Sequence, residues 1–549
     1  MSRLPVLSEA VPDVAERRRR IEAEPLPANI GALIDEAAVE AGDKVLWNFF
    51  EAGSTITYKE MRRAVNGIAA RLTELGVGKG THVAVMLPNI PEFPLCWLAL
   101  GRIGAVMVPV NVSYRERELA HVVNDAQATL IVAHADCMSV VEACLDQGLV
   151  ELLPSRVVLV GKDNVSSKSE THMWSDIASE PLERFDVSEP VSHDDLLNIQ
   201  YTSGTTGFPK GCMLTQRYWI SSGKVNAFRD GRRFERILAS TPFFYMDPQW
   251  LLLMTLYQRA TLFVAARQST SRFMQWVREH RINFCLLPWV LHSQPGHEHE
   301  NQNEIVRANI YGAPKDIHAK LEIRYDLNAR EAFGMTEIGP TLFMPLERED
   351  MVGSGSCGVP CPFRETKVVG EAGEELPPGE VGELLVRGPG IMKGYYRNAE
   401  ATAAAFTDGW FHTGDLFRKD ADGFHTIVGR KKDMIRRSAE NIAAREVESV
   451  LNAVPAVAES AVIGVPDPLR GEEVKVYIKL VGDAVAEDVL PRIIEAAQRG
   501  LAPFKVPRFY AFRDEFPRTV SLKIAKQLLA QETDDLRAGS FDRVESRWL

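Results

Sequence analysis

Long apolar runs are missing from this sequence, and none comes close to the roughly 20 residues that a helix needs to cross a bilayer. The first residues, MSRLPVLSEAVPDVAERRRRIEAE, also lack the apolar core of a secretory signal peptide. The seven cysteines are scattered, which predicts reduced thiols and argues against a disulfide framework. Cys357 and Cys361 lie close together, but no second pair or nearby histidine completes a zinc motif. We therefore expect a cytoplasmic protein without a membrane span.

An excess of basic residues is missing as well. The chain has 63 lysines and arginines against 74 aspartates and glutamates, a net charge of −11. Proteins that bind nucleic acids usually carry a basic patch, so this balance argues against a nucleic-acid partner. The arginine run 17–20 is followed at once by Glu22 and Glu24, and we interpret it as the solvated face of a helix. A membrane or partner contact is the less favoured interpretation.

The length of 549 residues exceeds the roughly 100–200 residues of a typical domain, which predicts at least two domains. Residues 57–75 show a helical pattern that begins with a Thr57/Glu60 capping box and stops at Gly76. The apolar runs 83–87, 105–108 and 129–133 are typical of buried strands. Helices that alternate with buried strands predict an α/β fold with largely parallel sheets.

The segment 201–211, YTSGTTGFPKG, has the composition of a phosphate-binding loop. Glycines let backbone N–H groups approach an anion, hydroxyls add donors, and a lysine adds a positive charge. The pattern is not a Walker motif, because the fifth residue after Gly204 is Pro209. A polar surface turn is the alternative interpretation. The candidate phosphate ligands are Thr202, Ser203, Gly204, Thr205, Thr206, Gly207 and Lys210.

This segment resembles the signature loop of the adenylate-forming enzymes, a family of acyl-CoA ligases, peptide-synthetase adenylation domains and luciferases. The resemblance covers roughly residues 29–527. It continues in order through 311–314 (YGAP), 333–337 (FGMTE), 382–388 (GELLVRG), 411–415 (FHTGD), 429–430 (GR) and 517–523 (PRTVSLK).

The resemblance implies a large N-terminal domain and a small mobile C-terminal domain. The first, residues 1–429, would hold parallel-type sheets with helices plus a β subdomain. The second, residues 434–549, would be α+β, and the pattern change after 429–433 (GRKKD) fits a junction there. The hinge would be residues 430–433, pivoting at Lys432, and Ser438 and Ala439 would line the coenzyme A tunnel. Family members usually carry glycine where this chain has Ala439.

The same resemblance assigns the nucleotide-binding residues. Phe333 would stack on adenine, with Gly312, Ala313 and Pro314 on its other side. Gly334 and Met335 belong to the same motif as Thr336, which would bind the α-phosphate. Glu337, with Thr206, would bind Mg²⁺, a hard cation that prefers oxygen ligands. Asp415 would bind the ribose hydroxyls, and Arg430 would be a second contact, to the ribose or to a phosphate. Lys523 would be the catalytic cation of adenylation, although the preceding residue is Leu522 where the family usually has glycine.

The acyl pocket implied by the resemblance lies between three segments of the chain. Asp247 beside Trp250 and Trp289 could receive a trimethylammonium group, because cations bind aromatic faces. The alternative is that Asp247 caps a helix and the tryptophans belong to the core. The pocket residues are Tyr245, Met246, Asp247, Trp250, Trp289, Ile338 and Gly339.

The expected activity is that of an ATP-dependent acid–CoA ligase that uses ATP, Mg²⁺ and coenzyme A. The main alternative is a free-standing adenylation enzyme that loads a carrier protein, while an oxygenase or a non-catalytic binding protein is disfavoured. No Gly-x-Ser attachment site follows Lys523. The sequence identifies neither the carboxylic acid nor the oligomeric state, so a homo-oligomer is left open.

Overall fold

The computed structural model describes residues 11–161, 171–202, 209–437, 440–482, 484–501, 503–519 and 523–549. Contacts divide the chain into two compact units. The first unit holds the described residues up to Thr202, those of 208–366, and 386–411. The second holds 367–385 and the described residues of 412–549. This division does not coincide with the domain boundary expected at residue 430, which stays a prediction. Within the described residues, no helix has both the length and the apolar character needed for a membrane span.

The first unit contains a sheet in the strand order β7-β6-β5-β3-β4-β8-β9. Its strands are parallel except for the hairpin between β8 and β9. Helix α3 begins with the predicted Thr57/Glu60 capping box, which confirms the predicted helix. The elements are α2 (Ile30–Ala41), α3 (Tyr58–Glu74), β3 (His82–Met86), α4 (Glu92–Ile103), β4 (Val106–Pro109), α5 (Glu116–Asp125), β5 (Leu130–His134), α6 (Met138–Asp146), β6 (Val157–Val160), β7 (His172–Met173), α7 (Trp174–Ile177), β8 (Leu196–Thr202) and β9 (Lys210–Thr215).

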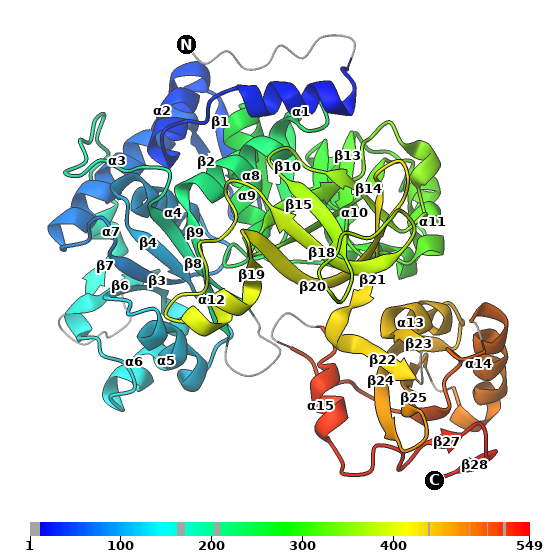
Figure 1. Cartoon of the computed structure of the whole chain (residues 1–549). Coiled ribbons are helices and arrows are strands. Elements are labelled where there is room, and N and C mark those ends of the chain that lie inside the picture. The colour runs from blue at the N-terminus through cyan, green and yellow to red at the C-terminus, as the bar shows by residue number, and fades with distance from the viewer. Residues whose placement is uncertain are drawn as a thin grey trace. The chain divides into compact units, whose positions relative to one another are not determined.

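A second sheet of the first unit runs in the order β16-β15-β14-β13-β12-β10-β11-β1-β2. Its central strands are parallel, and β14, β15 and β16 are antiparallel. Helices α8 and α9 lie side by side in the interior (Figure 1). The elements are β1 (Val45–Phe49), β2 (Ser54–Thr57), α8 (Gln216–Phe228), β10 (Arg236–Ala239), α9 (Met246–Gln258), β11 (Thr261–Val264), α10 (Thr270–Glu279), β12 (Phe284–Leu286), η3 (Trp289–Ser293), β13 (Arg307–Ile310), α11 (Lys315–Tyr325), β14 (Ala329–Met335), β15 (Gly339–Phe343), β16 (Ser356–Pro360) and α12 (Ala399–Ala405).

Helix α1 (Val14–Ala23) corrects one expectation from the sequence. The arginine run 17–20 is not wholly a solvated face, because Arg17 is only 4% exposed. Its guanidinium donates to the main-chain oxygen of Arg229 at 2.8 Å and pairs with Glu347 at 2.8 Å. Both partners lie far along the chain, so local sequence could not reveal that the run anchors the helix.

The second unit carries a separate apolar core between a sheet and the helices α13 and α14. The long hairpin of β24 and β25 forms its centre, with β26 parallel to β25. Strand β19 (Phe406–Thr407) belongs to the first unit, and β17 (Glu365–Val369), β18 (Val381–Arg387) and β20 (Trp410–Lys419) each lie partly in the first unit and partly in the second. The other elements of the second unit are β21 (His425–Arg430), η5 (Lys431–Asp433), β22 (Met434–Arg437), β23 (Glu440–Ala443), α13 (Ala444–Asn452), β24 (Val457–Asp467), β25 (Gly471–Leu480), α14 (Ala486–Gly500), β26 (Phe509–Phe512), α15 (Lys526–Gln531), β27 (Phe541–Asp542) and β28 (Arg547–Trp548).

Candidate active site

Glu337 lies in the turn between the antiparallel strands β14 and β15 and is only 8% exposed. The Tyr395 hydroxyl donates a hydrogen bond to its Oε1 at 3.1 Å. The main-chain N–H of Met392 donates to the Glu337 carbonyl at 2.8 Å. Burial, and after it the Glu337 charge, raises the pKa of Tyr395, so the phenol stays protonated and remains a donor. Hydrogen bonds therefore fix both the side chain and the backbone of Glu337.

Lys210 approaches the same tyrosine. It begins β9, and its Nζ lies 5.1 Å from the centre of the Tyr395 ring. Main-chain hydrogen bonds join residues 393–396 to β9, among them Tyr396 N–H to the Gly211 carbonyl at 2.8 Å. The structure thus brings two predicted residues, Lys210 and Glu337, to one unpredicted residue, Tyr395. The sequence analysis did not single out Tyr395, because its partner Glu337 lies 58 positions away in the chain.

The ends of the predicted phosphate loop form a hairpin. Thr202 ends β8 and pairs with Lys210 at the start of β9. Five of the predicted phosphate ligands lie outside the described residues: Ser203, Gly204, Thr205, Thr206 and Gly207. The hairpin therefore places the two ends of the loop, while the roles of the five residues stay predictions.

A buried carboxylate organises the predicted adenine segment. Glu331, on β14, accepts hydrogen bonds from the backbone N–H groups of Gly312 at 3.1 Å and Ala313 at 3.2 Å. Gly312 has φ +63°, which favours glycine. Phe333 is two residues further along β14 and so belongs to the same face of the strand as Glu331. The predicted residues Gly312, Ala313 and Phe333 are thus linked through Glu331, which the sequence did not single out.

The remaining residues of this motif lie where β14 turns into β15. Gly334 and Met335 end β14, Thr336 is in the turn, and Pro314 directly precedes α11. A Cβ atom on Gly334 would come within 2.6 Å of the Gly339 carbonyl oxygen, so the two strands approach each other closely here. This close approach explains the glycine in the motif.

Asp415 and Arg430, in the second unit, form a cross-strand ion pair. They face each other in the register of β20 and β21, and Arg430 Nε lies 2.7 Å from Asp415 Oδ1. Asp415 is only 2% exposed. A buried carboxylate paired with a more exposed guanidinium makes a rigid polar pair, and the structure brings these two predicted ribose ligands together.

Glu383 anchors the turn before Asp415 and the start of η5. Its carboxylate accepts from the Gly414 N–H at 3.1 Å and lies 2.8 Å from Lys431 Nζ and 3.3 Å from His412 Nδ1. Burial raises the pKa of Glu383, but the hydrogen bonds from Lys431, His412 and the Gly414 backbone, together with the Lys431 charge, outweigh burial, so the net shift is downward. The carboxylate therefore stays ionised, and it is a second acid that the sequence did not single out.

Lys523 closes a short backbone hairpin. The Thr519 N–H donates to its carbonyl at 2.8 Å, and its own N–H donates to Thr519 Oγ1 at 3.2 Å. Desolvation, and after it the charge of Arg430, lowers the pKa of Lys523, whereas Asp415 raises it. The side chain nevertheless remains accessible to solvent. Leu522, Ser438 and Ala439 lie outside the described residues, as does the side chain of Lys432 in η5.

Of the predicted acyl-pocket residues, Asp247 and Trp250 contact each other, whereas Trp289 contacts a different residue. Asp247, in the first turn of α9, accepts a hydrogen bond from the Trp250 indole at 3.1 Å. Burial raises the pKa of Asp247, and the Trp250 hydrogen bond opposes it. Burial, and after it the Asp247 charge, raises the pKa of Tyr311, the first residue of the 311–314 motif. Trp289 instead stacks on His292, with ring centres 5.8 Å apart.

The other predicted pocket residues lie at the start of α9 and at the start of β15. Tyr245 directly precedes α9, and Met246 is its first residue. Ile338 is fully buried, and Gly339 has φ +65°, with Ser222 Oγ only 3.1 Å from where a Cβ would stand. These contacts do not test the predicted pocket, which stays a prediction.

A magnesium site with Glu337 fits this structure. Among the described residues, no group of three His, Cys, Asp or Glu side chains could hold a metal ion by itself. Mg²⁺ commonly takes one or two protein carboxylates together with substrate phosphates. Glu337, fixed near Lys210 by Tyr395, supplies such a carboxylate beside a cation.

Family models and individual relatives both match most of this chain. The model of the AMP-binding enzyme family matches residues 34–396, and that of the AMP-binding enzyme C-terminal domain matches residues 446–523. A feruloyl-CoA synthase from Amycolatopsis is 33% identical over 486 residues, which is 86% of this chain and 93% of the relative. A crotonobetaine/carnitine–CoA ligase from Citrobacter koseri is 29% identical over 520 residues, which is 91% of this chain and 98% of the relative.

Solved structures resemble the chain over most of its length. ATP-bound MatB from Rhodopseudomonas palustris has a TM-score of 0.81 and 27% identity, covering 93% of this chain and 100% of that one. The o-succinylbenzoate CoA synthetase of Bacillus subtilis with its acyl-adenylate has a TM-score of 0.78 and 24% identity, covering 90% and 97%. Because its identity is below 25%, the similarity to the o-succinylbenzoate CoA synthetase supports only the fold.

Proposed function

This chain belongs to the AMP-binding enzyme family and is an AMP-forming acid–CoA ligase, and from this premise we propose which residues carry its two half-reactions. In the first, a carboxylate attacks the α-phosphate of ATP, giving acyl-AMP and pyrophosphate. In the second, the thiol of coenzyme A attacks the acyl carbon, giving the thioester and AMP. The named relatives are CoA ligases or synthases, so carrier-protein loading is not favoured.

Glu337 is the residue on which the proposal for the first half-reaction rests. We propose that it binds Mg²⁺, with Tyr395 orienting its carboxylate and Lys210 binding phosphate oxygens. The ion, when bound, would neutralise charge on the phosphates. Thr336 would bind the α-phosphate, and the 202–207 segment the other phosphates. Phe333 and the 312–314 segment would hold the adenine.

The other predicted nucleotide-binding and catalytic residues belong to the second unit. We propose that Asp415 and Arg430 bind the ribose, because their ion pair presents a fixed carboxylate whose turn is held by Glu383. Lys523 would place its positive charge where negative charge develops during adenylation. For the second half-reaction, residues 434–549 would rotate about Lys432, and Ser438 and Ala439 would line the coenzyme A tunnel.

The acid is proposed to carry a cationic or hydrogen-bond-donating group far from its carboxylate. The proposal rests on the Asp247 carboxylate, which accepts a hydrogen bond from the Trp250 indole in surroundings that raise its pKa. A cationic head group would offset this unfavourable burial. An uncharged aromatic acid is the competing candidate, since a feruloyl-CoA synthase is among the relatives.

A panel of carboxylic acids tests these assignments. Acid-dependent pyrophosphate release with MgATP reports the first half-reaction, and thioester formation with coenzyme A reports the second. Replacing coenzyme A by a carrier protein in the same assay is the control for the acceptor. Pyrophosphate release without thioester formation from coenzyme A, for every acid in the panel, would contradict the ligase function.

We also propose a cytoplasmic location. All seven cysteines are buried free thiols, which is typical of proteins in a reducing compartment.

A further inference from the structure

Arg364 is a buried cation with an unusual set of partners. It is only 2% exposed, and among the described residues no carboxylate forms an ion pair with it. Its guanidinium instead donates to four main-chain carbonyls: Ile338 at 3.0 Å, Phe363 at 3.0 Å, Pro389 at 2.8 Å and Gly390 at 3.1 Å. Burial lowers its pKa to about 10, so it stays charged at neutral pH. A buried charge without a counter-ion is costly, and these carbonyls must offset that cost.

Three of these carbonyls, those of Ile338, Pro389 and Gly390, belong to two segments that both hold Glu337. Ile338 directly follows Glu337 in the turn between β14 and β15. Gly390 begins the segment that runs to Met392, whose N–H binds the Glu337 carbonyl, and to Tyr395, whose hydroxyl binds the Glu337 carboxylate. Arg364 therefore joins the two segments through Ile338, Pro389 and Gly390, in addition to the contacts that Met392 and Tyr395 make with Glu337.

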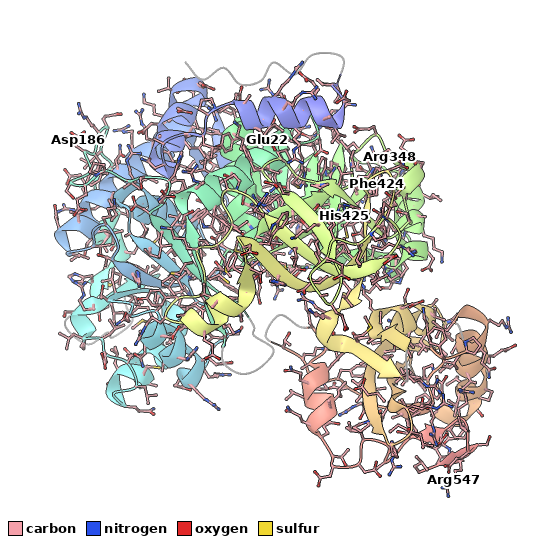
Figure 2. The ribbon with its side chains drawn as sticks, in the orientation of Figure 1. Glu22, Asp186, Arg348, Phe424, His425 and Arg547 are labelled. Atoms are coloured by element: carbon pink, nitrogen blue, oxygen red, sulfur yellow. The ribbon has the colours of Figure 1, made fainter. Side chains whose placement is uncertain are left out.

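Arg364 is itself held by helix α1. Arg18 Nη2 donates to the Arg364 carbonyl at 2.9 Å, and the Phe363 N–H donates to Glu22 Oε1 at 2.8 Å. Glu22 also pairs with Arg18 at 2.9 Å, and it lies on the side of α1 that faces the rest of the first unit (Figure 2). Phe363 has φ +63°, a strained conformation for a residue with a side chain, so outside contacts must stabilise this backbone.

We infer that Arg364 is a positioning residue for the magnesium loop: it fixes the segment that carries Glu337, and α1 fixes Arg364 in turn. The inference rests on the proposed role of Glu337 in binding Mg²⁺. Arginine suits this task because its planar fork offers five donors in fixed directions, which a lysine cannot reproduce. A displacement of about 1 Å in a catalytic group can cost roughly 100-fold in rate, so a loop without this cross-link should bind the metal poorly.

The test uses the full-length chain and measures pyrophosphate release as a function of free Mg²⁺ at saturating ATP and acid. Arg364→Met should raise the Mg²⁺ concentration for half-maximal rate about tenfold. Arg364→Lys should raise it less, because lysine keeps the charge, although its three donors leave a single atom and cannot reach all the carbonyls. Glu22→Gln, a change near the surface, should raise it roughly two- to threefold. Should Arg364→Met fail to fold, Arg364→Lys and Glu22→Gln decide the outcome.

Two controls separate the explanations. Arg102→Met removes another largely buried arginine, one that joins α2 to α4 through Asp35 at 2.9 Å, and it should lower stability without changing the Mg²⁺ dependence. Glu337→Gln reports the proposed metal ligand itself. If Glu337→Gln shifts the Mg²⁺ dependence and the folded Arg364 variants do not, the inference about Arg364 fails alone. If Glu337→Gln shifts nothing, the proposed role of Glu337 and the inference fail together.

Discussion

Asp247, a residue of the proposed acyl pocket, lies where burial opposes its charge, and we expect its replacement to test the proposed substrate most directly. Burial raises its pKa, and the Trp250 indole compensates only in part. Tyr311 lies close enough for its own pKa to be raised by the Asp247 charge. An acid with a cationic head group would gain from this carboxylate, whereas an uncharged acid would have to cover it.

Asp247→Asn should therefore raise KM for a betaine-type acid. The expected loss is about 1–2 kcal/mol, or roughly 5- to 30-fold. An uncharged acid of similar size should be unaffected or bind better, because the variant has no charge to desolvate. Values of kcat/KM for a carnitine-like acid and its uncharged analogue, in both proteins, check this. A wild-type preference for the uncharged analogue would rule out the betaine proposal.

Lys523→Ala should abolish acid-dependent pyrophosphate release while sparing thioester formation from supplied acyl-AMP. Loss of a cation at a developing charge costs roughly 100- to 1,000-fold in rate. Because the pKa of Lys523 is lowered, its proton is lost at a lower pH than from an ordinary lysine. Wild-type adenylation should thus decline as pH rises through that lowered pKa. Normal pyrophosphate release by the variant would remove Lys523 from the mechanism.

Helix α3 shows how a local motif starts an element. Thr57 Oγ1 accepts from the Glu60 N–H at 3.2 Å, and the Thr57 N–H donates to the Glu60 carboxylate at 2.8 Å. The hydrogen bonds from the Thr57 backbone and then from its hydroxyl lower the pKa of Glu60. A carboxylate with a lowered pKa stabilises the fold above its unfolded pKa, and this contribution is lost as pH falls through the folded pKa.

Thr57→Ala should destabilise the first unit by about 1 kcal/mol at neutral pH, with no change in kcat. The loss should shrink at acid pH, because a protonated Glu60 no longer completes the capping box. Thr57→Ser keeps the hydroxyl and serves as the matched control. Urea unfolding of both variants at two pH values provides the measurement, and an equal loss for serine and alanine would show that the hydroxyl is not responsible.

At the scale of the whole molecule, the proposed mechanism requires residues 434–549 to change position between half-reactions. The proposed pivot, Lys432, lies in η5, a 3₁₀ turn of three residues. Backbone φ in such a turn is about −50 to −70°, close to the value of about −65° that proline imposes. A proline there should thus preserve the described conformation and oppose any other.

Lys432→Pro should leave pyrophosphate release nearly intact and block thioester formation. Lys432→Ala, which keeps backbone freedom, is the control and should support both half-reactions. Single-turnover measurements of acyl-AMP and of thioester separate the two steps. If the proline variant loses both equally while the alanine variant keeps both, the pivot lies elsewhere or the turn has been damaged.

The sequence by itself determined the features that depend on neighbours in the chain. The capping box of α3, the parallel strands β3, β4 and β5, and the motifs of the family are all contiguous, so their residue types and spacing were sufficient. Periodicity and capping act within a few residues, which is why they could be predicted without a structure. The residue types of the predicted phosphate loop are local in the same sense.

Only the tertiary structure decided which distant residues support the site. Tyr395 reaches Glu337 across 58 positions, Arg364 reaches Ile338 across 26, and Arg17 reaches Glu347 across 330. Glu331 and Glu383 likewise gain their roles from backbone groups on other segments. A tyrosine, an arginine or a glutamate carries no sign of such a partner in its own sequence context. Burial and hydrogen-bond geometry arise only when the strands and helices have packed, because a buried polar group must then find a partner wherever the fold places one.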